Sequence, residues 1–419
     1  MPCRTEGALI VPNMQDHPRK LRVGLVGTGQ RAATYFRNVP GELGDRVELT
    51  AVADTDRRRR DIFCDLVDQV PVHYDDGVEM LRRESLDAVI VATPNDQHVP
   101  SAVEAMSQSL PLLLEKPVAT IVEGLAELWQ AEQGRSASHT VAGFVLRYTP
   151  FYEEVRRIVR SGRLGEILAV QADENLGTGL TMVQYQGWRQ DIARSGGWML
   201  EKCCHDLDVL AYVLDSRPVR VSSMASALAF RPRPRGEQLP RFDVDAGSGE
   251  IDYGDAATKT ALRETEQHSP YAESSLPDRQ VATIEFENGT LATFTAVMAQ
   301  PRTTRRLRVF GTEGLLEGDL GAQRIDLSFP DPEGGPGHAS EQVHIEVGKS
   351  GHNGGDEVLG DTFWNLAAGE DRAPRATLQD GIDACLCAIA LQESASSGLP
   401  VDLAGLREQV YGVERIRSE

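Results

Sequence analysis

The chain lacks long apolar runs, paired cysteines and an excess of basic residues, and each absence excludes a class of protein. None of its apolar segments approaches the roughly 20 residues that a helix needs to cross a bilayer, so we expect no membrane association. Its six cysteines form no CxxC pair, which argues against a zinc ribbon or a disulfide framework and favours a reducing, cytoplasmic compartment. With 63 acidic and 43 basic residues the formal charge is -20, which would repel nucleic acid.

An apolar leader is also missing from the first 20 residues. Their short apolar run ends at Pro12 and is far shorter than the core of a signal peptide. We therefore expect residues 1–20 to form a disordered or extended tail on a cytoplasmic protein. The whole chain, at 419 residues, is about twice as long as one comfortable core, and we expect two domains, at 21–147 and 148–419.

The first domain has the pattern of an α/β sheet. Short apolar runs alternate with helix-compatible stretches, and continuous rather than alternating apolarity indicates strands that are covered on both faces. This pattern predicts a parallel sheet with crossover helices. The expected strands lie at 21–27, 47–54, 86–94, 111–117 and 140–147.

The second domain has more strands and fewer helices. Asn288-Gly289 between two strands is typical of a type I′ hairpin turn, and the whole run predicts a largely antiparallel sheet in an α+β domain. A polar segment, 231–278, is long enough to cover a site or an oligomer contact. The expected strands lie at 167–175, 219–229, 281–286, 290–299, 305–310 and 343–347, and the expected helices at 151–161, 356–368 and 378–393, the last two packing back across the domains.

A glycine-rich turn follows the first strand. Gly27, Gly29 and Ala32 form GxGxxA between a strand and a helix, where the first glycine permits a tight turn and the second lets the backbone approach a pyrophosphate. Asp54 ends the next strand, where a carboxylate accepts the ribose hydroxyls of NAD and repels a 2′-phosphate. The basic run 57–60 leaves NADP possible, the alternative being a solvated first helical turn.

Three further segments carry polar side chains suited to catalysis. Thr93–His98 and Glu115–Pro117 follow strands of the parallel sheet, whose carboxyl ends are where ligands bind, so Lys116 is expected to meet the nicotinamide. Glu201 and His205 stand four residues apart on an expected helix and would share one face. Imidazole titrates near neutrality and suits removal of a hydroxyl proton. Taken singly, the lysine could be a solvated charge and the histidine a structural residue.

With these segments the chain resembles the Gfo/Idh/MocA family, which contains glucose-fructose oxidoreductase and inositol dehydrogenase. The resemblance rests on GTGQRA, TPNDQH, EKP and the Gly196–Asp208 segment, in that order. It implies an N-terminal, doubly wound Rossmann sheet followed by an α+β domain whose large, mainly antiparallel open sheet binds substrate and pairs subunits, as a homodimer or homotetramer. It also implies NAD(P)-linked oxidation or reduction of a sugar, cyclitol or related polyol.

The resemblance assigns roles to individual residues. Lys116 matches the lysine that orients the reacting hydroxyl, and His205 matches the catalytic histidine; Glu201 stands where many relatives have aspartate, so the proton relay there is expected to be rearranged. Asp208 is expected to cap or buttress the helix rather than to react. The cofactor-binding residues are expected to be Gly27, Thr28, Gly29, Gln30, Arg31, Asp54, Thr93, Pro94, Asn95, His98, Glu115 and Lys116.

Substrate contacts are expected from residues near these segments. Sugars are commonly held by aromatic faces and charged donors. Candidates are Arg147 and Tyr148 after the last parallel strand, Trp188 and Arg189 before the His205 helix, and His352 in an HNGGD segment similar to one in the family. Adjacent Cys203 and Cys204 are expected to be packing residues, because they cannot readily share one tetrahedral ion with His205, and no metal is expected.

Two other functions remain open from the sequence. One is a redox-neutral enzyme that retains NAD and cleaves or epimerises a sugar through transient oxidation, as some relatives of this family do. The other is a sugar-nucleotide sensor without catalysis, against which the presence of both Lys116 and His205 argues.

Overall fold

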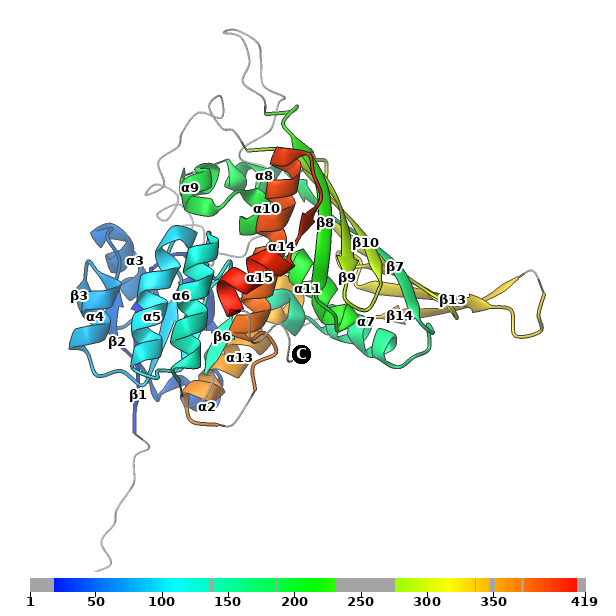
Figure 1. Cartoon of the computed structure of the whole chain (residues 1–419). Coiled ribbons are helices and arrows are strands. Elements are labelled where there is room, and N and C mark those ends of the chain that lie inside the picture. Colours follow the sequence, from blue (N-terminus) through cyan, green and yellow to red (C-terminus); the bar gives the residue numbers. More distant parts are fainter. Residues whose placement is uncertain are drawn as a thin grey trace, which may run out of the picture.

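The computed structural model describes residues 19–135, 139–185, 187–230, 276–335, 337–346, 351–370 and 373–412. Two halves are evident in Figure 1, one built around each of two sheets, with late helices between them. Nearly all of the expected tail 1–20 and of the polar segment 231–278 lies outside the described residues.

The N-terminal half is a six-stranded parallel sheet with the strand order β3-β2-β1-β4-β5-β6. This is the order of the doubly wound Rossmann fold, and it confirms the expected fold class. Strand β3 was not expected, because it lies at the sheet edge and Val72 and His73 are exposed. The strands are β1 (Leu21–Val26), β2 (Val47–Ala53), β3 (Val72–Tyr74), β4 (Ala88–Val91), β5 (Leu112–Leu114) and β6 (Thr140–Ala142).

Helices connect these strands and cover the sheet. In Figure 1, α4, α5 and α6 lie side by side across one face, and each contacts its neighbour, whereas α1 contacts α3. The covered strands are almost completely buried, which explains their continuous apolar sequences. The helices are α1 (Gln30–Arg37), α2 (Gly41–Gly44), α3 (Arg57–Val67), α4 (Gly77–Arg83), α5 (His98–Ser107) and α6 (Val122–Gln133).

The C-terminal half is a nine-stranded sheet with the order β14-β13-β12-β11-β7-β10-β9-β8-β15. All neighbours pair antiparallel except β7 and β10, so the expected mainly antiparallel open sheet is confirmed. Strands β12 and β13 were not expected. The strands are β7 (Ile167–Gly177), β8 (Pro218–Ser226), β9 (Arg279–Phe286), β10 (Leu291–Gln300), β11 (Thr304–Gly311), β12 (Leu315–Asp319), β13 (Arg324–Pro330), β14 (His338–His344) and β15 (Val401–Asp402).

The hairpin between β9 and β10 differs from the expected type I′ turn. The two strands pair antiparallel, as the Asn288-Gly289 sequence predicted. Gly289 has φ +84°, but Asn288 is not left-handed, and the amide of Gly289 donates to the carbonyl of Phe286 at 2.9 Å. This is a type I turn closed by a left-handed glycine, because a type I′ turn needs positive φ at both central residues.

Late helices join the two halves. Helix α14 (Leu378–Ser397) packs on β8 and also contacts β6, α15 (Ala404–Tyr411) packs on α6, and α13 (Gly355–Ala367) contacts α1. The expectation that the last helices pack back across the domains is therefore confirmed. Against the nine-stranded half lie α7 (Pro150–Arg160) and α11 (Cys204–Leu214), and the remaining short helices are α8 (Thr178–Gln184), α9 (Ile192–Ser195) and α10 (Trp198–Glu201). Among the described residues, no helix is both long and apolar enough to cross a membrane.

Candidate active site

The glycine-rich turn sits between β1 and α1 and presses against the loop after β4. Gly27 has φ +91°, and a Cβ there would lie 2.6 Å from the carbonyl oxygen of Ala92 and 2.7 Å from the amide nitrogen of Thr93. Gly29, the N-cap of α1, has no side-chain cap, and a Cβ there would meet only the Ala92 oxygen, at 3.8 Å. The first glycine is thus required by the fold itself, whereas the second leaves space in front of the helix N-terminus.

Asp54 holds this turn in place. Its Oδ2 accepts hydrogen bonds from the Thr28 amide at 2.9 Å and from the Thr28 hydroxyl at 2.8 Å, and its Oδ1 accepts from the Asp56 amide at 2.9 Å. The predicted acidic residue at the end of β2 therefore lies directly beside the glycine-rich turn, where the sequence pattern placed it.

The basic run 57–60 divides between surface and interior. Arg57 is exposed and lies 4.0 Å from Asp61, whereas Arg60 is buried, donates to the carbonyl of Tyr74 and pairs with Asp75 at 2.5 Å. Arg59 lies 3.7 Å from Asp56, the residue that caps α3. Arg60 is thus a structural residue, which corrects the expectation of a wholly solvated helical turn.

The loop after β4 contributes one buried hydroxyl and two structural side chains. Thr93 Oγ1 is buried without a hydrogen-bond partner, and Thr93 lies against Gly27. Asn95 donates to the carbonyl of Ser195 at 2.8 Å, which ties this loop to α9. His98 is fully buried, with Nδ1 2.8 Å from the carbonyl oxygen of Pro117 and Nε2 3.0 Å from that of Thr93. The His98 ring therefore links the loop after β4 to the loop after β5.

Lys116 lies at the centre of a buried charged group. Its Nζ donates to the carbonyl of Glu201 at 2.6 Å and lies 3.7 Å from Glu201 Oε1, which also lies 3.3 Å from Arg189 Nε. The Lys116 side chain is 14% exposed. Burial acts to lower the pKa of Lys116, but the charge of Glu201 outweighs it and the pKa is raised. Lys116 is therefore a permanent cation that can donate hydrogen bonds but cannot act as a base near neutrality.

The expected single helix carrying Glu201 and His205 is broken. Helix α10 ends at Glu201 and α11 begins at Cys204, with Lys202 and Cys203 between them. Lys202 turns to Glu174 on β7, at 3.4 Å. Glu201 pairs with Lys116 and Arg189, and the expected single helix through Glu201 and His205 is interrupted at Lys202 and Cys203. Cys203 and Cys204 are fully buried, and burial raises the pKa of both thiols.

His205 is a buried neutral imidazole. It is 5% exposed, its Nδ1 has no hydrogen-bond partner, and its ring packs edge-on against Phe144. Burial lowers the pKa of His205 well below 6.5, and the positive charges of Lys116 and Lys202 act in the same direction. At neutral pH the ring is uncharged and able to accept a proton.

A chain of ion pairs joins the glycine-rich turn to the C-terminal half. Arg31 Nε lies 2.7 Å from Glu115 Oε1, and its Nη1 lies 2.8 Å from Asp356 Oδ1. The hydroxyl of Tyr35 also donates to Glu115. Asp356 Oδ2 lies 2.9 Å from His352 Nδ1, and the His352 ring lies 6.5 Å from that of His205. Arg31 and Glu115, both expected at the cofactor, thus bind each other and hold His352 beside His205.

Arg147 and Tyr148 do not belong to the group of side chains around Lys116. Arg147 Nε and Nη2 donate to Asp208 at 2.7–3.0 Å, and its Nη1 lies 3.1 Å from Asp380. The Tyr148 hydroxyl accepts from the amides of Arg375 and Ala376, and burial raises its pKa to about 12. Both side chains are committed to internal partners, and this removes them from the expected substrate contacts.

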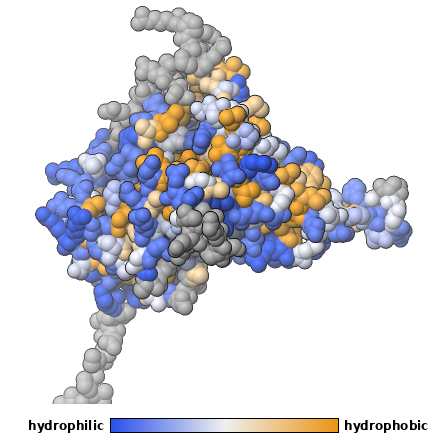
Figure 2. Space-filling model, viewed as in Figure 1, coloured by the Kyte–Doolittle hydropathy of each residue, from blue (hydrophilic) through white to orange (hydrophobic). Residues whose placement is uncertain are grey.

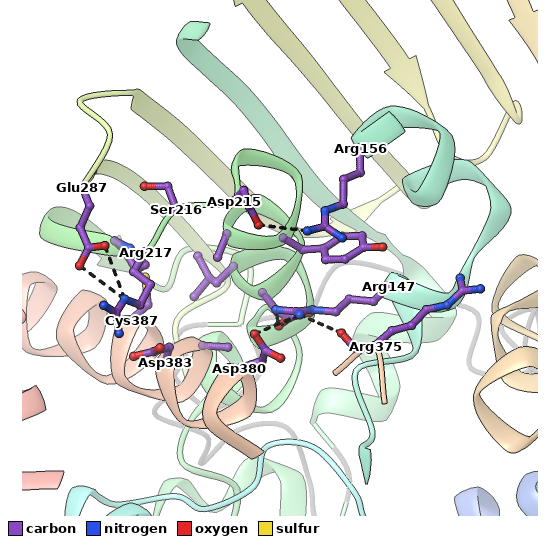
Figure 3. A pocket seen from close by; sticks show the side chains of 16 residues that line it. Arg147, Arg156, Asp215, Ser216, Arg217, Glu287, Arg375, Asp380, Asp383 and Cys387 are labelled. Atoms are coloured by element: carbon purple, nitrogen blue, oxygen red, sulfur yellow. Dashed lines mark hydrogen bonds and ion pairs between the residues drawn. The ribbon is translucent and has the colours of Figure 1, made fainter. Parts of the chain in front are cut away.

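Arg147 instead lines a separate cavity of about 330 Å³ between α7, α11 and α14. Figure 3 shows Arg147, Arg156 and Arg217 among the acidic side chains of this cavity, with Asp380 and Asp383 on α14 opposite. Its lining does not include Lys116, Glu201 or His205. Asp208, also in this lining, is so deeply buried that its pKa is raised to about 7 despite Arg147.

The nine-stranded half adds a buried acidic pair that the sequence did not reveal. Arg305 on β11 forms ion pairs with Glu174 on β7 and, at 2.7 Å, with Asp206 on α11. Burial raises the pKa of Asp206, whereas the charge of Arg305 outweighs burial and lowers the pKa of Glu174. The adjacency of Asp206 to His205 was the one available signal; Glu174 and Arg305 lie in ordinary strand sequence.

These residues fit a bound dinucleotide. The uncapped N-terminus of α1, the open space at Gly29, the unpartnered Thr93 hydroxyl and the Asp54 carboxylate lie around one turn, as a pyrophosphate and a ribose require. Fold and site together define an NAD-binding Rossmann oxidoreductase.

Comparison with family models assigns the chain to one family. Residues 21–142 match the model described as "Oxidoreductase family, NAD-binding Rossmann fold", and residues 152–317 match the Gfo/Idh/MocA C-terminal domain. The chain belongs to the Gfo/Idh/MocA family of oxidoreductases, as its motifs indicated.

Similar proteins include an oxidoreductase and several inositol 2-dehydrogenases. YteT of Bacillus subtilis is 25% identical over 403 residues, covering 88% of this chain and 93% of YteT. Inositol 2-dehydrogenase of Rubrobacter xylanophilus is 26% identical over 245 residues, covering 56% of this chain and 64% of that enzyme. The fold also matches the structure of a levoglucosan dehydrogenase in complex with NADH and L-sorbose, with TM-score 0.71 and 17% identity over 92% of this chain and 99% of the other.

Proposed function

We propose that this enzyme transfers hydride between NAD and a hydroxyl-bearing carbon of a sugar, cyclitol or related polyol. Similarity to inositol 2-dehydrogenases supports this class of substrate. The observation that carries the proposal is the pairing of a permanently charged lysine with a neutral, buried histidine at the carboxyl edge of the parallel sheet. Bound NAD would supply the hydride acceptor, held by Gly27, Gly29, Asp54 and Thr93.

Lys116 and His205 divide the work on the substrate hydroxyl. Lys116 donates a hydrogen bond to the oxygen and stabilises its developing negative charge, because its ammonium is held beside Glu201 in a site of low exposure. His205 accepts the hydroxyl proton. The main-chain bond to Glu201 aims the Lys116 ammonium, so Glu201 acts as a positioning residue.

Substrate recognition falls to residues beside this pair. The guanidinium of Arg189 lies 4.7 Å from the centre of the Trp188 ring, and it shares the Glu201 carboxylate with Lys116. We propose that Trp188, Arg189 and His352 contact the polyol, since a ring face combined with charged donors suits a hydroxyl-rich ligand.

The test is NADH formation with a panel of cyclitols, sugars and sugar acids, followed at 340 nm on the wild-type enzyme and on His205→Ala. The proposal expects stoichiometric NADH from at least one polyol, and a fall in kcat of ~10²- to 10⁴-fold in the variant. Conversion of a sugar derivative without net NADH would favour the redox-neutral alternative, and NAD binding without conversion of any compound would favour a sensor.

We also propose a homodimer or homotetramer formed through the nine-stranded sheet. Met224, Val281 and Leu291 are exposed on its strands, on the face opposite the helices. In Figure 2 apolar side chains gather on the half of the molecule that carries this sheet, whereas the Rossmann half is mostly hydrophilic in the same view. Sedimentation velocity on the wild type and on Met224→Glu tests the proposed oligomer. A monomeric wild-type protein would contradict it.

A further inference from the structure

We propose that His352, held by Asp356, relays the proton between His205 and solvent. The inference rests on the proposed function, in which His205 accepts the proton of the substrate hydroxyl. It assigns to the HNGGD segment a role in proton transfer beyond contact with substrate.

The first observation is the histidine–carboxylate pair itself. His352 Nδ1 lies 2.9 Å from Asp356 Oδ2, and the other oxygen of Asp356 lies 2.8 Å from Arg31 Nη1. Asp356 is buried, and although burial acts to raise its pKa, Arg31 and His352 outweigh it and the pKa is lowered. A fixed carboxylate of this kind holds the imidazole in one orientation.

The second observation is the difference in exposure between the two histidines. His205 is 5% exposed, whereas the His352 side chain is 38% exposed. Their ring centres are 6.5 Å apart with an angle of 47° between the planes. One water molecule or one substrate hydroxyl can bridge such a gap. His205 therefore needs a route for its proton, and His352 lies between it and solvent.

The third observation is the backbone that presents His352. His352 and Asn353 have φ +47° and +54°, both left-handed, and Asn353 Nδ2 donates to the carbonyl of Leu320 at 3.3 Å. Two successive non-glycine residues in this region are held only where the surroundings fix them, and such conformations cluster at functional sites. The Asp356 pair and the Leu320 bond supply that constraint here.

The proposed step balances as follows. The C–H bond of the substrate breaks with its electron pair, which leaves as hydride to NAD; the O–H bond breaks, its proton passes to His205, and a carbonyl forms. The proton then passes to His352 and to solvent. The positive charges of Lys116, Lys202 and Arg305 disfavour the protonated form of His205. His352, held by Asp356 and 38% exposed, lies next to it with access to solvent. The charges around His205 thus favour release of the proton that it accepts.

The activity test is His352→Asn, because asparagine tolerates the left-handed backbone but cannot titrate. We expect kcat to fall by about tenfold, less than the ~10²- to 10⁴-fold for loss of the group that takes the proton directly, because His205 remains in place. NAD affinity should be unchanged, and added imidazole should restore much of the lost kcat. His338→Asn on exposed β14 is the matched control and should behave as wild type. An unchanged kcat, or a loss that imidazole does not restore, would overturn the relay.

A second measurement does not depend on turnover. With histidines labelled at Cε1, NMR titration of the NAD-bound protein follows His205 directly. His352→Asn removes a group that lowers the pKa of His205, so the His205 titration should move to higher pH. A His205 titration that does not move in His352→Asn contradicts the relay, even if no polyol is found to react. A wild-type enzyme that is inactive on every polyol would count against the proposed function and not against the relay.

Discussion

The two halves of the molecule build their parts of the site in different ways. The parallel sheet supplies contiguous segments, Gly27–Ala32 and Glu115–Pro117, at the carboxyl ends of strands, where the topology gathers them. The nine-stranded half supplies Glu174 and Arg305, which are neighbours across the β7–β11 pair, and Asp206 from α11, which the side-chain ion pair with Arg305 joins to them. The first part depends on backbone geometry, and the second on charge compensation in the interior.

The largest expected effect is on the Rossmann side. Lys116→Met removes the ammonium that faces the reacting oxygen but leaves the glycine-rich turn intact. We expect kcat to fall by ~10²- to 10⁴-fold with little change in the NAD dissociation constant, measured by steady-state kinetics and fluorescence titration. Lys20→Met, at an exposed surface position, should match wild type. Retention of kcat within a few-fold would remove Lys116 from the chemistry.

In the nine-stranded half, Arg305→Leu tests how far stability depends on the cation that compensates the buried carboxylates. The substitution leaves Glu174 and Asp206 buried together without their shared cation, and breaking a buried pair costs about 3–5 kcal/mol in the free energy of unfolding. Arg324→Leu removes an exposed partner of Asp326 and should cost less than ~1 kcal/mol. Urea denaturation measures both, and equal losses would contradict the distinction between the two regions.

Substitutions at the two glycines of the turn should affect folding and cofactor binding separately. Gly27→Ala places a methyl group against the Ala92 carbonyl at a left-handed φ, so we expect a loss of at least ~1–3 kcal/mol in stability. Gly29→Ala meets no close protein atom and should leave Tm nearly unchanged while weakening NAD binding by about tenfold. Thermal melts with and without NAD show both effects. A Gly29→Ala enzyme that binds NAD normally would mean that the pyrophosphate lies elsewhere.

A smaller effect concerns the choice of cofactor. We expect NAD to bind at least about tenfold more tightly than NADP, because Asp54 lies beside the turn and repels a 2′-phosphate. Asp54→Ala should narrow the difference, and Asp54→Asn, which keeps a hydrogen-bond acceptor for Thr28, should narrow it with less disturbance of the turn. Titration of NAD and NADP into the wild type, Asp54→Ala and Asp54→Asn measures this difference in affinity. A wild-type preference for NADP would contradict the role given to Asp54.

The sequence predicted the contiguous parts of this molecule well. Unbroken apolar strands and GxGxxA predicted the parallel sheet and its turn, because both depend on local pattern. Strand β3 was missed because it is short and exposed at an edge, and β12 and β13 because their short sequences include Gly318 and several charges. The break between α10 and α11 depends on the tertiary pair of Lys202 with Glu174, which local helix periodicity does not contain.

In the candidate site, too, the contiguous motifs were predictable and the long-range contacts were not. Lys116, Glu201 and His205 were identified as candidates from short motifs, whereas the ion pairs that link residues far apart in the sequence were not predicted. Arg31, Glu115 and Asp356 are 84 and 241 positions apart along the chain. The parallel sheet brings Glu115 to Arg31, and the packing of α13 against α1 adds Asp356. Arg147 and Tyr148 were placed at the substrate because they follow a parallel strand, but the contacts with Asp208 and with the 375–376 segment hold them away from Lys116.

The most direct test of the account is the pH dependence of kcat in the wild-type enzyme and in His205→Ala. Because burial and neighbouring cations lower the pKa of His205 well below 6.5, the account predicts that kcat holds from pH 8 down to about 6.5 and falls only at lower pH, as the base becomes protonated. The acidic limb should be absent from the residual activity of His205→Ala. A wild-type limb centred above pH 7, or one that persists unchanged in the variant, would contradict the assignment of His205 as the base.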